Sequence, residues 1–131
     1  MITKILLATV ILLGGFGAKH GNNKPQTSSQ FVYVLTYTAE FKQAIRWGPK
    51  ESGVVREHVA YVKDLVDEGK GYVLGRTSNV YDPELFGIVV FEAKDIEAAK
   101  RIMNDDPVIK NNIMKGVVHP FTIVFLKEKS Q

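Results

Sequence analysis

The sequence predicts a single α+β domain whose elements follow the order strand, helix, strand, strand, helix, strand. Two kinds of segment support this order. Some are rich in β-branched and aromatic residues, as strands are, and others repeat apolar residues at helical spacing. A length of 131 residues with 45% hydrophobic content is sufficient for one buried core, and it places the chain among globular proteins.

The first two elements are a strand over residues 31–38 and a helix over residues 54–68. The strand segment consists almost entirely of aromatic, β-branched and leucine residues, with Phe31, Tyr33 and Leu35 on one face. In the helix, four valines recur at helical spacing and Leu65 broadens the apolar stripe. Those valines are Val55, Val59, Val62 and Val66. Gly69 is expected to end the helix.

The second half of the chain contains two strands, a helix and a last strand. The strands are expected over residues 72–77 and 86–92, with turn-forming residues between them. Asp95 is a predicted N-cap for a helix that continues to about Asn104, and the Asp106-Pro107 step ends that helix. The last strand is expected within residues 117–126, with a bend at Pro120.

This order predicts the ferredoxin-like plan, a four-stranded antiparallel sheet with both helices on one face. The opposite face of such a sheet has no cover within its own chain. Apolar residues that alternate along the strands would need a partner there, and a homodimer packed sheet to sheet provides one.

The residues before the domain divide into an export leader and a linker. Residues 1–18 combine a positive start, an apolar run over 5–13 and small residues around Gly17 and Ala18, which is the pattern of a secretory signal peptide. Residues 19–30 are polar and predict a flexible linker, so the domain is expected over residues 31–127. The sequence therefore predicts a periplasmic or secreted protein without a stable membrane anchor after cleavage. An uncleaved N-terminal anchor is the alternative.

Several classes of function receive no support from the composition. The formal net charge is +3 and no arginine cluster is present, so we expect no nucleic-acid partner. The absence of cysteine excludes thiol catalysis and thiolate metal sites. No phosphate-binding glycine loop and no clustered metal-ligand motif occurs, so we expect neither a metal nor a cofactor.

Three segments resemble the YCII-related family, a group of small domains of the dimeric α+β barrel type. They are the histidine-bearing helix over 58–69, the strand segment 72–76, and residues 96–108, which end in Asp-Asp-Pro-Val. The resemblance extends over roughly residues 31–125. It implies that His58 and Asp106 form the active-site pair. Some members of the family are lactone dehalogenases. This chain departs from the usual pattern at Val108, where phenylalanine is common, and in its export leader.

The chemistry that these residues predict is proton transfer. His58 is expected to act as a general acid or base, Asp106 to orient its imidazole, and Arg76 to bind an anionic group of the substrate. Structural roles are the alternatives: a helix histidine with a satisfied hydrogen bond, a helix stop at Asp-Pro, and a surface charge at the end of a strand.

The predicted function is therefore that of a cofactor-independent lyase-, isomerase- or dehalogenase-like enzyme acting on a small organic acid or lactone. A non-catalytic module that binds a small ligand on the same fold is the main alternative. A cofactor-free monooxygenase is a third, less favoured by the His–Asp pattern.

Overall fold

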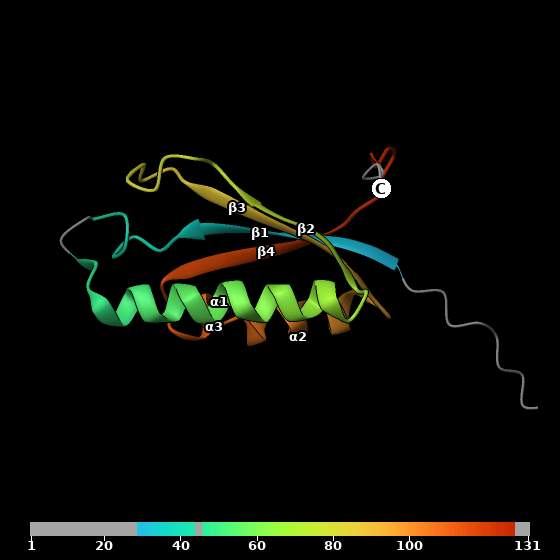
Figure 1. Cartoon of the computed structure of the whole chain (residues 1–131), viewed down its shortest axis with the longest axis horizontal. Coiled ribbons are helices and arrows are strands. Elements are labelled where there is room, and N and C mark those ends of the chain that lie inside the picture. Colours follow the sequence, from blue (N-terminus) through green and yellow to red (C-terminus); the bar gives the residue numbers. More distant parts are fainter. Residues whose placement is uncertain (1–28, 44–45, 128–131) are drawn as a thin grey trace, which may run out of the picture.

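The computed structural model describes residues 29–43 and 46–127, which fold into one sheet with its helices on a single face (Figure 1). The elements are β1 (Ser29–Tyr37), α1 (Pro49–Asp67), β2 (Gly71–Arg76), β3 (Phe86–Ala93), α2 (Ile96–Asp105), α3 (Pro107–Lys110) and β4 (Met114–Pro120). All strand pairs are antiparallel, in the order β2-β3-β1-β4. The predicted ferredoxin-like α+β fold is therefore confirmed.

The predicted leader over residues 1–18 lies outside the described residues, as does the predicted linker apart from Ser29 and Gln30, which are the first residues of β1. Ser29 and Gln30 are paired with Ala93 and Glu92 of β3, so β1 begins two residues before the expected Phe31. Within the described part of the chain, no helix combines the length and apolar character needed to cross a membrane.

Helix α1 begins five residues earlier than the valine spacing predicts. Pro49 occupies its first turn, and the Glu51 carboxylate accepts a hydrogen bond from the Gly48 backbone N–H at 3.0 Å. Proline is well suited to the first helical position, where its missing N–H costs nothing. The helix ends as predicted, because Gly69 adopts a positive φ of 74° directly after the C-cap.

The second half of the domain follows the prediction at α2 and departs from it afterwards. Asp95 caps α2 by accepting a hydrogen bond from the Ala98 N–H at 2.8 Å. The chain then forms an additional short helix, α3, and β4 begins at Met114 and stops at Pro120. The sequence predicts a later and longer strand, within 117–126. Pairing with β1 determines its extent instead, since Tyr37 faces Met114 and Phe31 faces Pro120.

The core lies between the sheet and the helices. The inward side chains of the central strands β1 and β3 form its middle, and α2 contributes Ala99 and Met103 from below. Those strand residues are Phe31, Tyr33, Leu35, Val89 and Phe91. The alternating pattern of the strands thus places one face of the sheet against the helices.

The other face of the sheet, which we call the outer face, carries the alternate residues of the same strands. The register pairs Val34 with Val117 and Val32 with Val90, and neither of the two buried valines, Val32 and Val90, belongs to the main core cluster. Val73, Phe86 and Val117 are exposed large apolar side chains. No helix of the described chain covers this face (Figure 1).

Candidate active site

The site is built around Asp106, which occupies the break between α2 and α3. Its backbone is extended (φ −62°, ψ 128°), as expected for a residue that precedes proline. The side chain turns back onto α3, and its Oδ1 accepts a hydrogen bond from the Val108 N–H at 3.1 Å. Asp106 therefore ends one helix and caps the next, which holds its carboxylate in a single orientation.

Helix α1 brings His58 to this carboxylate. The imidazole Nδ1 lies 2.9 Å from Oδ1 and 2.8 Å from Oδ2 of Asp106. The histidine side chain is 11% exposed, whereas the aspartate is fully buried. Forty-eight residues separate the two in the sequence, and the tertiary fold brings them into contact.

A third residue, Tyr33 of β1, completes the cluster, although the sequence assigns it only to the core. Its hydroxyl donates a hydrogen bond to Asp106 Oδ2 at 2.8 Å, and its side chain is fully buried. Burial, reinforced by the adjacent Asp106 carboxylate, raises the pKa of Tyr33 far above its ordinary value. The tyrosine therefore remains a hydrogen-bond donor throughout the physiological pH range.

Tyr61 links α1, which carries His58, to α2, which ends next to Asp106. One turn beyond His58 on α1, its hydroxyl donates to the backbone carbonyl of Ile102 in α2 at 2.7 Å. Burial raises the pKa of Tyr61 to about 12, with smaller contributions from Asp105 and Asp106. The hydrogen bond fixes the distance between the helices near His58.

His58 lines a cavity of about 730 Å³ between α1, the sheet and the segment that joins β2 to β3. The walls are mostly apolar and include Tyr37, Trp47, Val59 and Val108. Trp47 packs edge-on against Tyr37, with the ring centres 5.4 Å apart. The volume is in the range of pockets that bind small molecules.

The apolar stripe predicted for α1 is therefore not buried along its whole length. Val54, Val62 and Leu65 are buried, whereas Val59 is exposed and lines the cavity. Val108 also lines the cavity and is almost fully buried. A bulkier side chain at this position would reduce the free volume.

Arg76, at the end of β2, lines the same cavity as His58. Its Nη1 donates hydrogen bonds to the backbone carbonyls of Thr77 and Ser78, at 3.0 and 3.3 Å. These contacts orient a guanidinium group at the wall of a mostly apolar cavity. All three residues nominated from the sequence thus contribute to one site, although their roles in a reaction stay predictions.

The cluster is suited to holding a proton rather than a metal. Asp106 accepts hydrogen bonds from Tyr33 and Val108 while it contacts His58, an arrangement that suits a carboxylate acting only as an acceptor. Within residues 29–43 and 46–127, no group of three or more histidine, aspartate or glutamate side chains is placed to hold a metal ion.

Comparisons with known proteins agree with this architecture. Residues 30–122 match the sequence profile of the YCII-related domain. No curated protein shows a significant match to the chain.

Two of the solved structures that match the chain share its fold. The first is 5-chloro-2-hydroxyhydroquinone dehydrochlorinase from Burkholderia phenoliruptrix, in complex with 2,5-dihydroxybenzoquinone. It is 17% identical, with a TM-score of 0.53 and coverage of 71% of this chain and 93% of that chain. The second is muconolactone isomerase, at 18% identity and a TM-score of 0.54, with coverage of 78% and 97%.

Proposed function

This chain belongs to the YCII-related domain family, and from that premise we propose that it is an exported enzyme that transfers a proton on a small organic acid or lactone. The observation that carries the proposal is the hydrogen-bonded series Tyr33–Asp106–His58, in which His58 lines a largely apolar cavity. Two structures with this fold bear the names of a dehydrochlorinase and an isomerase, which supports a reaction of this general class.

In this proposal His58 is the catalytic acid/base group. Asp106 accepts a hydrogen bond from Nδ1, so Nε2 becomes the nitrogen that exchanges a proton with the substrate. The carboxylate stabilises the imidazolium that forms when Nε2 takes up a proton. Proton transfer by a positioned side chain contributes about 10²- to 10⁴-fold to a reaction rate.

The reaction begins with removal of a proton from a carbon next to a carbonyl group. The electron pair of the broken C–H bond moves into the carbonyl system, and His58 holds the proton. In an isomerisation the imidazolium returns that proton to a different carbon. In a dehydrohalogenation the electron pair forms a carbon–carbon double bond and expels a halide ion, and the proton is later released to solvent.

Arg76, which lines the same cavity as His58, would bind the substrate carboxylate or a developing oxyanion. A guanidinium pairs with a carboxylate through two parallel hydrogen bonds, and the low polarity of the surrounding walls strengthens the attraction. Tyr37 and Trp47 supply flat surfaces against which a planar substrate can pack.

The proposal includes a homodimer that joins the outer faces of two sheets. The exposed apolar side chains Val73, Phe86 and Val117 support it, because sheet-to-sheet packing would remove them from water. Sedimentation of the chain at twice its monomer mass tests this assembly.

Deuterium exchange tests the role of His58 even while the natural substrate is unidentified. A panel of lactones and unsaturated carboxylic acids is incubated with the protein in D₂O, and proton NMR follows the loss of signals from carbons next to the carbonyl. We expect exchange of at least one class of compound with the natural chain, slowed by about 10²- to 10⁴-fold in His58→Ala.

The matched control is Glu57→Gln, which changes the exposed neighbour of His58 and should leave exchange unchanged. Equal exchange in His58→Ala would show that another group removes the proton. Binding of panel compounds without exchange in any of them would instead identify the domain as a non-catalytic ligand-binding module.

A further inference from the structure

The segment Phe121–Leu126, which we call the C-terminal arm, follows β4 but lies outside the sheet. Two hydrogen bonds anchor its beginning. The Phe121 N–H donates to the backbone carbonyl of Gln30, and the Ile123 N–H donates to the Gln30 side-chain Oε1, both at 2.9 Å. The start of the arm is thus held at a defined position at the end of the sheet.

The rest of the arm presents its apolar side chains to solvent. Val124 is 91% exposed, Phe125 is 90% exposed and Leu126 is 54% exposed. The arm reads Phe-Thr-Ile-Val-Phe-Leu, a composition that favours extended structure packed against a surface. Contiguous exposed apolar side chains of this kind mark interaction sites.

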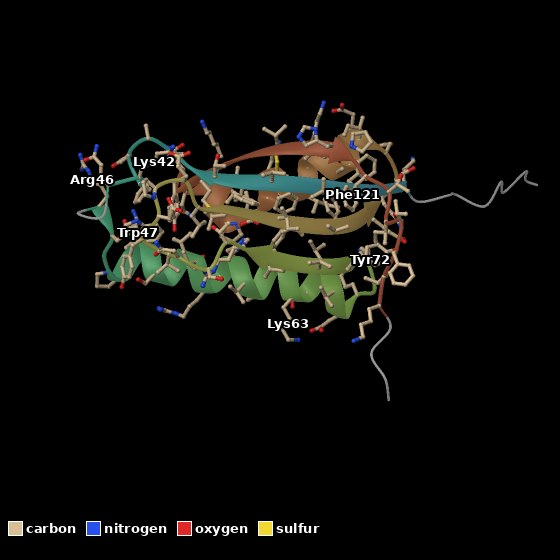
Figure 2. The ribbon with its side chains drawn as sticks, turned by 90° about the horizontal axis from the view of Figure 1, so that it is seen from above. Lys42, Arg46, Trp47, Lys63, Tyr72 and Phe121 are labelled. Atoms are coloured by element: carbon tan, nitrogen blue, oxygen red, sulfur yellow. The ribbon has the colours of Figure 1, made fainter. Side chains whose placement is uncertain are left out.

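The arm and the outer face lie on the same side of the molecule. In Figure 1 the segment after β4 rises from the sheet on the side away from α1 and α2. Figure 2, which looks onto the outer face, shows Phe121 at one end of the sheet and Trp47 at the opposite end. The arm is therefore anchored at the end of the sheet where Phe31 faces Pro120, on the same side of the molecule as the outer face.

We propose that the C-terminal arm packs against the outer face of the sheet in a second copy of this chain, and that the second copy returns the same contact. This inference rests on the sheet-to-sheet homodimer of the proposed function and adds to it a reciprocal contact between each arm and the outer face of the other copy. A twofold interface requires one subunit to present both complementary surfaces. The arm and the outer face satisfy this requirement because both are apolar and lie on the same side of the domain.

A second copy suits the arm better than a lipid surface does. Segments that bind membrane surfaces combine apolar residues with several basic ones. Among residues 121–127, Lys127 is the one charged residue. The anchored start also favours a protein surface, because two hydrogen bonds to Gln30 direct the arm along one path.

Substitution at the tip of the arm tests its contact with the second copy. Val124→Ser with Phe125→Ser removes two apolar side chains that make few contacts within one chain, so the fold of the monomer should persist. We expect sedimentation velocity over a concentration series to show a dimer dissociation constant at least about tenfold higher than that of the natural chain. Val66→Ser, on the exposed side of α1, is the matched control and should leave the constant unchanged.

The possible outcomes distinguish failure of the arm contact from failure of the sheet-to-sheet dimer and from failure of the proposed catalytic activity. The double variant could leave the dissociation constant unchanged while Val117→Lys, on the outer face, dissociates the dimer. That result would overturn the proposed contact of the arm and would still support the sheet-to-sheet dimer. A natural chain that stays monomeric would overturn both, and so would a monomer that binds vesicles of anionic phospholipid through the arm. Deuterium exchange of the panel compounds, which tests the role of His58, is measured independently in every case.

Paramagnetic labelling locates the arm directly, because the chain has no cysteine. A chain spin-labelled at Phe125→Cys is mixed with an unlabelled chain enriched in ¹⁵N, so that only contacts between copies broaden the amide signals. Broadening at Val117 and Val73 is expected. A label at Ala60→Cys, exposed on α1, is the control and should not affect these amides. Absence of broadening from the arm label in a mixed dimer would overturn the proposal.

Discussion

At the level of single residues, the site depends on the buried carboxylate of Asp106 and on the groups that hydrogen-bond to it. Asp106 is fully buried, and a charge in that position is tolerated only when hydrogen bonds replace its lost hydration. His58, Tyr33 and the Val108 N–H supply those contacts from three different elements. The same contacts that make burial tolerable also hold the imidazole in one orientation, so stability and the proposed chemistry share their residues.

Tyr33→Phe tests whether the hydrogen bond from Tyr33 to Asp106 stabilises the fold. The substitution keeps the ring in the core and removes only the hydroxyl that donates to Asp106. Because it leaves a buried acceptor less well satisfied, we expect the free energy of unfolding in urea to fall by about 1–3 kcal/mol at neutral pH. Tyr81→Phe, in which the changed side chain is exposed, is the control.

The destabilisation caused by Tyr33→Phe should decrease at alkaline pH. The raised pKa of Tyr33 means that the unfolded chain releases this proton first, above the ordinary value of 10.0. The folded state then binds more protons than the unfolded state, so the stability of the natural chain falls as pH rises. The difference between the natural chain and Tyr33→Phe should therefore be smaller at about pH 11 than at about pH 9. A constant difference would contradict the raised pKa that burial gives Tyr33.

At the level of secondary-structure elements, close approach between β4 and the helices positions Asp106. Gly116 lies on the inner face of β4 opposite Leu35, beneath α2 and α3. A Cβ atom at this residue would lie 2.6 Å from Met103 Sδ and 3.2 Å from Ile109 Cδ1. Glycine therefore allows the two short helices, and the aspartate between them, to pack directly on the strand.

Gly116→Ala and Gly75→Ala form a matched pair that measures this approach. Both residues lie in edge strands, but a Cβ at Gly75 would meet its nearest atom at 3.9 Å, an ordinary contact. We expect Gly116→Ala to lower the free energy of unfolding by about 1–3 kcal/mol through overpacking. Gly75→Ala should change it by less than about 1 kcal/mol. Equal effects in chemical denaturation would show that Met103 moves aside without cost.

At the level of the whole molecule, the two faces of one sheet serve two purposes. The inner face carries the core and, with α1, encloses the cavity that His58 and Arg76 line. The outer face is free of helices within the described residues and carries the apolar residues assigned to the proposed dimer. Variants of the outer face can therefore be studied without altering the side chains of the candidate site.

The cellular location of the molecule is a separate prediction. Residues 1–18 have the pattern of a cleaved export signal, so we expect the periplasm or the medium to contain a chain shortened by 17 or 18 residues. Mass spectrometry of the fractions measures the cut. Leu7→Lys, which places a charge in the apolar run, should retain the full-length chain in the cytoplasm. A full-length chain in the membrane fraction would favour the alternative of an uncleaved anchor.

Long, regular patterns in the sequence are reliable guides to this protein. The alternating residues of the central strands, the valine repeat of α1 and the Asp95 cap each predict an element that is present, because these signals act over neighbouring residues. The family resemblance identifies His58 and Asp106 as a pair, and the fold brings their side chains together. The valine repeat cannot show that Val59 faces a cavity, since helical spacing specifies a face and not what lies opposite.

Only the tertiary structure decided the rest. The hydroxyl of Tyr33 finds its acceptor 73 residues away, and no local pattern encodes that distance. The proline of the Asp106-Pro107 step predicts a helix stop but also suits the first position of a new helix, and packing against α1 and β4 selected the four-residue α3. The apolar run at 121–126 has the composition of a strand, yet β4 lies before it, because hydrogen bonding to β1 and not composition determines where a strand ends.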